Sequence, residues 1–224
     1  MNYYSESDIQ KIVQDVVARC AGGSGAACPQ THVAGEPIPL EVSARHVHLT
    51  AQAVEALFGP GHKLTKKRDL SQPGEFLAEE RVKIVTAKGE LAAVAVLGPE
   101  RKAVQAEVSL TDARALGIAA PVNLSGNLTG GGDAILIGPA GIWEAKGAVI
   151  AAKVHIHMTP DHARSCGVHD GESVRVRVES ARPLTFDDVL VRVSPNFDLA
   201  MHVDFDEANA CAWSKDARAV ILKK

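Results

Sequence analysis

The sequence predicts a mainly β fold, made of small barrels or sandwiches with short helices rather than of a doubly wound sheet. Apolar and polar residues alternate in short runs at 82–85, 174–178 and 189–193, with turn residues between the runs. Helix-like patterns are brief and occur only at residues 51–58, 111–116, 160–166 and 206–211 beyond the N-terminal segment. In addition, one strand–helix unit repeats along the chain.

The first twenty residues predict an amphipathic helix. Apolar residues recur there with the spacing of one helical face, at Ile9, Ile12, Val13, Val16 and Val17. Residues 21–36 are rich in glycine, alanine and proline, which predicts a flexible linker. The helix 1–20 either docks on its own domain or binds another protein. Its polar face lacks the Lys and Arg enrichment of helices that lie on lipid.

Composition excludes several classes of function. The chain has 224 residues, of which 46% are apolar and 23% charged, so it can bury a sizeable core. Its formal net charge of −3 argues against nucleic-acid binding, and its apolar runs are too short to span a bilayer. The N-terminus lacks the apolar segment of a secretory signal. The four cysteines, at 20, 28, 166 and 211, form no CxxC pair and are interpreted as reduced thiols of a cytoplasmic protein.

One unit, an extended stretch followed by a helix, occurs four times. Its copies begin at His46, Glu107, His155 and His202, which are 61, 48 and 47 residues apart. In each copy a polar–apolar–polar tripeptide is followed by an apolar residue and then by Thr or Asp. That fifth residue is the expected helix N-cap, and the predicted caps are Thr50, Thr111, Thr159 and Asp206.

The repeat predicts two metal sites. Side chains at positions i and i+2 of a strand lie on one face, so each HxH triplet offers two imidazoles to one ion. The first position of each remaining unit supplies a third ligand. The two predicted sets are His46, His48 and Glu107 for one ion and His155, His157 and His202 for the other. Three ligands leave an open position, as in catalytic zinc sites, although these ligands also suit Mn, Fe, Co or Cu. The other histidines, at 32, 62, 162 and 169, are interpreted as surface or structural residues.

Candidate anion-binding groups lie near these sets in the sequence. Arg101 follows a turn just upstream of Glu107, and a guanidinium suits bidentate contact with phosphate. Residues 125–132 form a glycine-rich loop whose amides can hold an anion, and residues 66–68 are a small basic cluster. No nucleophile elbow or reactive-cysteine context is present. Metal-assisted chemistry on a carbonyl or phosphoryl oxygen is therefore favoured over a covalent enzyme intermediate.

Several ordered motifs together resemble one family. They are Arg45-His-Val-His-Leu-Thr50, Gly98-Pro-Glu-Arg101, Gln105-Ala-Glu-Val-Ser109, Ser125-Gly126, Val154-His-Ile-His-Met-Thr-Pro160 and the segment from His202 to Ala210. With these motifs the chain resembles, from about Pro37 to Leu222, the PduL-type phosphate propanoyltransferases. These are the phosphotransacylases of bacterial microcompartments.

The resemblance implies two small β-barrel domains capped by short α-helices, one of residues 37–46 plus 155–224 and the other of residues 47–154. It implies two zinc ions (Zn2+) per chain on the six ligands above, and reversible acyl transfer between coenzyme A and phosphate. The acyl group is propanoyl, with acetyl as the alternative. By the same resemblance Arg101 is catalytic, Arg101 and Ser125 bind phosphate, and Ser43, Arg68 and Asn209 contact coenzyme A.

The resemblance also implies where the protein works and with what. The helix 1–20 resembles an encapsulation peptide that binds shell or lumen proteins, so the expected location is the microcompartment lumen within the cytoplasm. A homo-oligomer is expected, and no nucleic-acid or membrane partner. Two rival functions remain from the residues alone: a zinc-dependent hydrolase of thioesters or phosphoesters, and a non-catalytic metal-binding module.

Overall fold

The computed structural model of the protein describes residues 33–222. The predicted helix 1–20 and most of the predicted linker 21–36 lie outside these residues. The strands are β1 (Val33–Val42), β2 (His46–His48), β3 (Lys66–Asp69), β4 (Phe76–Val85), β5 (Glu90–Gly98), β6 (Gln105–Val108), β7 (Val122–Asn123), β8 (Gly132–Ile137), β9 (Ile142–Ala152), β10 (His155–Met158), β11 (Ser173–Glu179), β12 (Leu184–Val193), β13 (Ala200–Val203) and β14 (Arg218–Leu222). The helices are α2 (Ala51–Phe58), α3 (Leu110–Leu116), α4 (Pro160–Cys166) and α5 (Phe205–Ala210).

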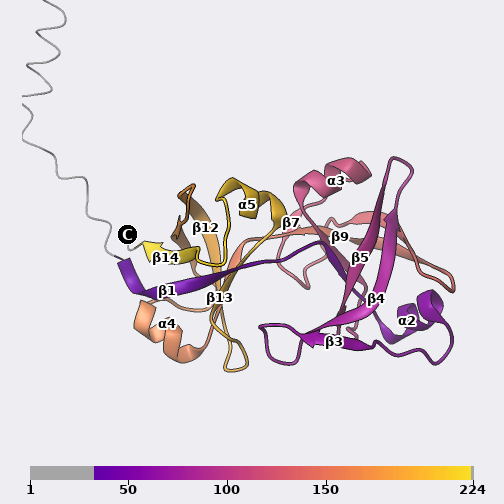
Figure 1. Cartoon of the computed structure of the whole chain (residues 1–224), viewed down its shortest axis with the longest axis horizontal. Coiled ribbons are helices and arrows are strands. Elements are labelled where there is room, and N and C mark those ends of the chain that lie inside the picture. Colours follow the sequence, from indigo (N-terminus) through magenta and orange to yellow (C-terminus); the bar gives the residue numbers. More distant parts are fainter. Residues whose placement is uncertain (1–32, 223–224) are drawn as a thin grey trace, which may run out of the picture. The chain divides into compact units, whose positions relative to one another are not determined.

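The strands form two closed barrels, which Figure 1 shows side by side. The first barrel has the order β1-β13-β10-β12-β11-β14 and combines the first described strand with the last five. The second is a ring of β4, β5, β2, β6, β9 and β8, with β3 added beside β4 and β7 beside β9. Short strands in antiparallel and parallel pairs thus close without exposed sheet edges over most of the molecule. The prediction of a mainly β, two-barrel fold is confirmed.

The chain changes barrel at slightly different residues from those predicted. The first barrel begins at Val33, because β1 already pairs there with β14. His46 was predicted with the first barrel, but it starts β2, which pairs with β5 and β6 of the second. The chain returns to the first barrel at His155, where β10 pairs with β12 and β13. The described residues belong to one compact unit, so the treatment of the barrels as separate domains stays a prediction.

Each barrel encloses its own apolar core. Alternate residues of the strands are buried, for example the valines of β11, whose arginines face outward. Fully buried side chains of the first core include Ile38, Ile156 and Met201. Val47 and Leu136 lie in the second core, so the HxH segments also contribute apolar residues to packing. Cys166 and Cys211 are buried free thiols, in agreement with the reduced state predicted for them.

Each of the four helices follows directly on one of the short strands of the repeat. Thr50 caps α2 and Thr159 caps α4 through the side-chain oxygen, as predicted. The predicted caps Thr111 and Asp206 are wrong. In those two units the helix begins two residues earlier, because Ser109 and Asp204 accept the capping hydrogen bonds from Asp112 N and Glu207 N.

This difference in capping follows the chemistry of the repeat. In two copies the third position of the unit is a histidine, His48 or His157, which is a poor cap. The helix of these copies begins after the Thr two residues later, Thr50 or Thr159. In the other copies the third position is Ser109 or Asp204, which are good caps themselves.

Among residues 33–222 no helix has the length and apolar character needed to span a membrane.

Candidate active site

Strand register brings each predicted set of three ligands together. In the second barrel β2 runs antiparallel to β6, and His46 lies directly opposite Glu107. In the first barrel β10 runs antiparallel to β13, and His155 lies directly opposite His202. Directly opposed residues of such a pair have Cβ atoms about 5 Å apart, close enough for a shared ligand. The repeat therefore builds the same local arrangement twice, once in each barrel.

The first group, named the His/Glu set, consists of His46, His48 and Glu107, all of them buried. Nε2 of His46 lies 3.7 Å and Nε2 of His48 lies 3.9 Å from the Glu107 carboxylate. Burial lowers the pKa of His46, but the Glu107 charge outweighs it and the pKa is raised. Burial lowers the pKa of His48 to about 3. The set thus holds one carboxylate between two imidazoles.

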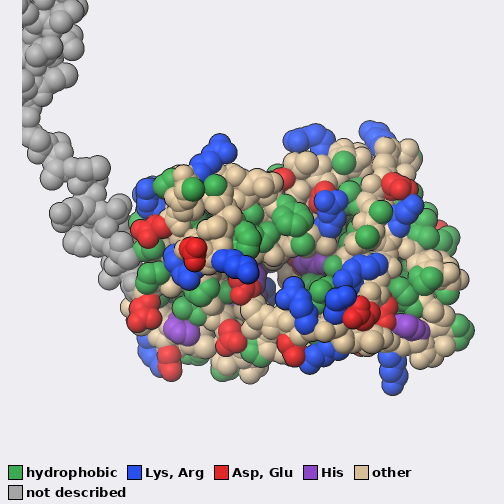
Figure 2. Space-filling model, viewed as in Figure 1, with side chains coloured by type: hydrophobic (Ala, Val, Ile, Leu, Met, Phe, Trp, Pro, Cys, Tyr) green, Lys and Arg blue, Asp and Glu red, His purple; other side chains and the backbone are tan. Residues whose placement is uncertain are grey.

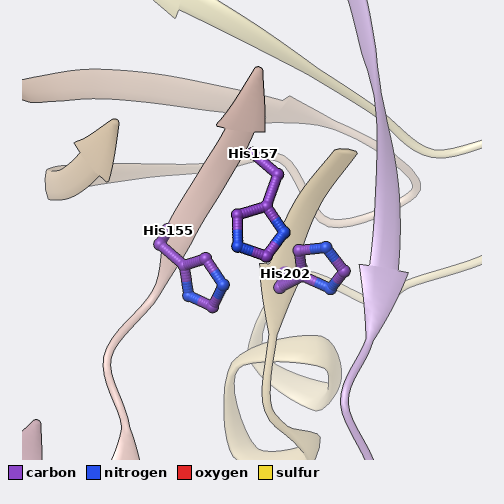
Figure 3. A group of neighbouring side chains, drawn as sticks. All are labelled: His155, His157 and His202. Atoms are coloured by element: carbon purple, nitrogen blue, oxygen red, sulfur yellow. The ribbon is translucent and has the colours of Figure 1, made fainter. Parts of the chain in front are cut away.

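The second group, named the His-only set, consists of His155, His157 and His202, whose rings point toward one another in Figure 3. Ring centroids are 4.7–5.2 Å apart. Burial, and the neighbouring imidazoles, lower the pKa of His157 to about 2 and that of His202 to about 3. Burial also lowers the pKa of His155. All three rings are therefore neutral at pH 7, the form that binds a metal.

Both sets fit a metal ion by their hydrogen bonding. The Nδ1 atoms of His46 and His155 lie 2.7 and 2.8 Å from the backbone oxygens of Ala44 and Lys153, so these nitrogens donate and Nε2 keeps a free lone pair. Within residues 33–222, three other histidines of the two sets each have one buried ring nitrogen without a hydrogen-bond partner. These atoms are His48 Nδ1, His157 Nδ1 and His202 Nε2.

An unsatisfied buried polar nitrogen costs about 1–3 kcal/mol, which a bound ion would offset. In each set the candidate ligand atoms lie within 4.8 Å of one another. Two groups of three side chains can thus each hold a metal ion, in the grouping that the repeat predicts.

One cavity of about 570 Å³ is lined by both sets. Its wall includes residues of β1, β2, β10 and β13, so it lies where the two barrels meet. In Figure 2 a hollow opens near the middle of the visible face, with histidine side chains inside it and Lys and Arg side chains around its edge. The two metal-capable groups therefore face the same cavity.

Arg101 and Ser125, the two residues predicted to bind phosphate, both line this cavity. Nη1 of Arg101 donates to Ser125 Oγ at 3.1 Å, and Nη2 forms an ion pair with Glu75 at 2.8 Å. Gln105 connects this pair to the His/Glu set: its Nε2 donates to Glu107 at 2.5 Å and to Ser125 Oγ at 3.0 Å. Its Oε1 accepts from Gly126 N at 2.8 Å, which fixes the start of the glycine-rich loop.

The three residues predicted to contact coenzyme A do not all lie in the cavity. Ser43 and Arg68 line it. Asn209 instead lines a smaller groove of about 260 Å³ with Phe205 and Trp213, beside α5. Val42 contributes to both walls, so the groove adjoins the cavity.

The remaining described histidines have the structural surroundings expected of them. His62 pairs with the buried Glu80 at 2.8 Å, His169 pairs with Glu172 at the surface, and His162 lies 3.0 Å from the Thr159 hydroxyl. His32 lies outside the described residues. None of these three belongs to a metal-capable group among residues 33–222.

Sequence reasoning missed three cavity residues, Glu75, Arg192 and Phe197, and it gave no role to Gln105, which hydrogen-bonds to two site residues. Gln105 stands two residues before Glu107, on the same face of β6, and this spacing alone could have revealed it. Glu75, Arg192 and Phe197 carry no local signal. They reach the site only through long-range pairing, as when β12 lies beside β10.

Comparison with known proteins agrees with this site. A family model described as phosphate propanoyltransferase matches residues 39–214. A phosphate propanoyltransferase of Enterococcus faecalis is 50% identical over 184 residues, covering 82% of this chain and 87% of the relative. One of Thermotoga maritima is 52% identical over 170 residues, covering 75% and 81%. One of Sebaldella termitidis is 40% identical over 218 residues, covering 97% and 98%.

The matched region contains both barrels' central strands and every predicted ligand. Identity of 40–52% over three quarters or more of the chain extends well beyond a shared local motif. The chain therefore belongs to the phosphate propanoyltransferase family, whose members are acyltransferase enzymes.

Proposed function

We propose that the protein transfers a short acyl group, propanoyl or acetyl, between coenzyme A and inorganic phosphate. The reaction is acyl-CoA + phosphate = acyl phosphate + CoA, and it is reversible. The observation that carries this proposal is the convergence of two metal-capable sets, one from each barrel, on a cavity that also contains Arg101 and Ser125. Membership of the phosphate propanoyltransferase family supports the choice of substrates.

The six ligands hold two zinc ions, His46, His48 and Glu107 on one and His155, His157 and His202 on the other. Ligation by nitrogen and oxygen without thiolate suits zinc in a catalytic role. When bound, the ions supply Lewis-acid stabilisation of negative charge on a carbonyl or phosphoryl oxygen. The buried rings without hydrogen-bond partners support this loading.

Arg101 and Ser125 bind and orient phosphate. Ser125 Oγ accepts from both Arg101 and Gln105, which leaves its own hydroxyl hydrogen to donate to an oxyanion. A phosphate oxygen forms a bond to the thioester carbonyl carbon, and Arg101 stabilises the oxyanion that develops. The C–S bond then breaks, and the coenzyme A thiolate leaves with the electron pair. No covalent enzyme intermediate is formed, and Arg101 is the catalytic residue of the proposal.

Ser43 and Arg68 contact coenzyme A at the cavity wall, and Asn209 contacts it from the adjoining groove. Arg68 is exposed on β3, where a cation can meet a phosphate of the cofactor without a large desolvation cost. Leu70, Leu77 and Leu97 also line the cavity and give a short apolar acyl chain a place to pack. Propanoyl and acetyl differ by one methylene, which a pocket discriminates by only about 1 kcal/mol or slightly more.

The helix 1–20 directs the enzyme to the lumen of a bacterial microcompartment, within the cytoplasm, by binding shell or lumen proteins. The apolar face of its sequence supports this role. Deleting residues 1–20 leaves catalysis unchanged and abolishes co-assembly with shell proteins. Full retention of the truncated enzyme in purified compartments would contradict this part of the proposal. The active enzyme is a homo-oligomer, which its mass in solution tests.

The reaction is tested by thiol release from propanoyl-CoA, with and without phosphate, on protein whose zinc content is measured. Thiol release should depend strictly on phosphate, because phosphate is the proposed acyl acceptor. The zinc content should be about two per chain, because six ligands form two sets of three. Sulfate in place of phosphate is the control for a general salt effect. Thiol release that does not need phosphate would instead indicate a zinc-dependent thioester hydrolase.

A further inference from the structure

Arg192 is a cavity residue with no role in the proposed reaction so far. It lies on β12, next to His157 in the parallel register of β12 and β10. Its side chain is half-buried and lines the cavity. Nη1 lies 3.4 Å from His157 Nε2, so the guanidinium stands directly beside the His-only set.

Arg192 differs from several other arginines of the structure in lacking an ion-pair partner. Arg101 pairs with Glu75 at 2.8 Å, Arg45 with Asp112 at 3.1 Å and Arg175 with Asp187 at 2.8 Å. Within residues 33–222 no carboxylate forms an ion pair with Arg192. A partly buried guanidinium without an ion-pair partner is costly, and a bound anion in contact with it would lower that cost.

An aromatic ring holds the Arg192 guanidinium in place. Its central carbon lies 5.6 Å from the ring centroid of Phe197, within the range of a cation–π contact. The same Phe197 ring stacks on His157, with centroids 4.1 Å apart and planes inclined by 25°. One aromatic side chain thus fixes both the cation and a metal-capable imidazole. An arginine prepared in this way loses little freedom when it binds an oxyanion.

We propose that Arg192 is a second phosphate-binding residue, which forms an oxyanion subsite on the side of the His-only set while Arg101 binds from the side of the His/Glu set. This inference rests on the proposed function, because it takes phosphate as a substrate. Burial lowers the pKa of Arg192, the charge of Asp170 opposes this shift, and the charge of Arg101, which lines the same cavity, adds to it. A guanidinium nevertheless stays protonated at any physiological pH.

The anion beside Arg192 is inorganic phosphate or the phosphoryl group of acyl phosphate, not a phosphate of coenzyme A. The phosphates of coenzyme A are separated from its thiol by the long pantetheine arm. Arg192 lies against His157, whose side chain is buried within the metal-capable centre where the acyl group must react. The Arg192 guanidinium, which lies beside this buried centre, is therefore placed to bind the phosphate that reacts. Arg68, exposed on β3, is better placed for the distant end of the cofactor.

The test compares Arg192→Gln and Arg192→Lys with the wild-type holoenzyme. Losing a charged hydrogen bond raises the KM for phosphate about tenfold or more in Arg192→Gln, and the KM for propanoyl phosphate in the reverse direction rises with it. Arg192→Lys keeps the charge without the bidentate fork, so its KM for phosphate lies between the two. The KM for propanoyl-CoA and the zinc content stay within twofold of wild type.

A second readout does not depend on turnover. Phosphate raises the melting temperature of the wild-type holoenzyme by binding the folded state, and Arg192→Gln loses most of this rise. The matched control is Arg175→Gln on the neighbouring strand β11, an exposed arginine outside the cavity, which keeps wild-type kinetics and the wild-type rise.

Three outcomes would overturn the inference: an unchanged KM for phosphate, a rise confined to the KM for propanoyl-CoA, or a lower kcat with an unchanged KM and an unchanged thermal response. A wild-type enzyme whose thiol release ignores phosphate would contradict the proposed function itself. The two failures are therefore distinguishable. If Arg192→Gln loses zinc, its KM no longer reports on Arg192 alone, and Arg192→Lys takes its place. A wild-type KM for phosphate in Arg192→Lys with full zinc content would then contradict the inference.

Discussion

The His/Glu set and the His-only set are built on the same strand–helix unit but differ in charge. In both, an HxH strand pairs antiparallel with a partner strand that supplies the third side chain directly opposite the first histidine. The third side chain is a carboxylate in one set and an imidazole in the other. A divalent ion would leave a net charge of +1 on the His/Glu set and +2 on the His-only set. One backbone design thus offers two centres of different electrophilic strength.

Their neighbours differ in the same sense. The His/Glu set lies in a polar network with Gln105, Ser125 and Arg101, and Arg101 is already neutralised by Glu75. The His-only set has an unneutralised guanidinium and an aromatic ring beside it. The cation beside the His-only set therefore has no ion-pair partner, whereas the cation beside the His/Glu set is already paired. The two sets thus differ in their own charge and in the groups beside them, and five experiments test this difference.

The largest effects are expected from the ligands themselves. Glu107→Gln removes the ionised ligand of the His/Glu set, and His202→Gln removes one ring of the His-only set. Each variant loses about one zinc per chain, and kcat falls about a hundredfold or more, because Lewis-acid stabilisation is worth several kcal/mol. Elemental analysis and thiol release measure both effects. Loss of both ions from either single variant would show that the two sites are not independent.

Arg101→Ala is expected to have the next largest effect. Removing a group that stabilises the developing oxyanion lowers kcat by about two to three orders of magnitude, while both zinc ions are retained. Lys83→Ala, which breaks an exposed ion pair with Glu90 outside the cavity, is the control and keeps wild-type activity. Near-normal turnover of Arg101→Ala would remove this residue from the mechanism.

Gln105→Leu addresses the polar network of the His/Glu set alone. Gln105 donates to Glu107 and to Ser125, so its loss frees a ligand to move. Zinc affinity of that set falls about 10–100-fold, as is usual when a supporting hydrogen bond to a ligand is removed. A chelator competition should then show one weakened and one unchanged zinc per chain. Two equally weakened ions would contradict the separate roles of the sets.

Acidity should destabilise the metal-free protein through the buried histidines whose pKa is lowered, which include His48 and the three rings of the His-only set. Burial lowers the pKa of His202 to about 3 in the folded state, whereas the unfolded chain has its usual value near 6.5. The unfolded state therefore takes up the proton first. Stability is complete above pH 6.5 and is lost as pH falls from there toward 3, by up to about 1.4 kcal/mol per pH unit for this ring.

His46 has the opposite sign, because its pKa is raised: its contribution is present below pH 6.5 and is lost as pH rises through the folded-state value. Urea unfolding of metal-free protein at pH 6.5 and 5.5 should thus show a smaller acid loss in His202→Gln than in wild type, by about 1 kcal/mol. His46→Gln should not reduce the loss. Equal acid sensitivity of all three proteins would be inconsistent with the charge difference between the sets.

The smallest effects are expected at the helix caps, where the two kinds of repeat differ. Thr159→Ala removes the cap of α4 and Ser109→Ala that of α3, and each lowers the free energy of unfolding by about 1 kcal/mol. Thr111→Ala is the control, since Thr111 lies inside α3 and does not cap it. A loss at Thr111 as large as at Ser109 would contradict the observed start of the helix.

Much of the site was predictable because it depends on short-range geometry. Residues i and i+2 share a strand face, so His46 with His48 and His155 with His157 follow from spacing alone. The third ligands follow from the register of the repeat, and the structure groups them accordingly. The caps at Ser109 and Asp204 were mispredicted because the repeat was read as uniform, although the local propensity of Ser and Asp already favoured the earlier start.

The rest depends on contacts between distant segments. Arg192 reaches the centre only because β12 pairs parallel with β10, and Glu75 only because the chain before β4 turns toward Arg101. Neither residue belongs to a motif or a periodic run. Asn209 lies in α5 and lines the neighbouring groove, a position that its sequence surroundings do not indicate.

The most direct test of the central claim is product identification by ³¹P NMR with propanoyl-CoA, inorganic phosphate and the two-zinc enzyme. Direct attack of phosphate on the thioester predicts one propanoyl phosphate formed for each coenzyme A released, with inorganic phosphate consumed in the same amount. Free propanoate with an unchanged phosphate signal would contradict the claim, since water and not phosphate would then be the acceptor.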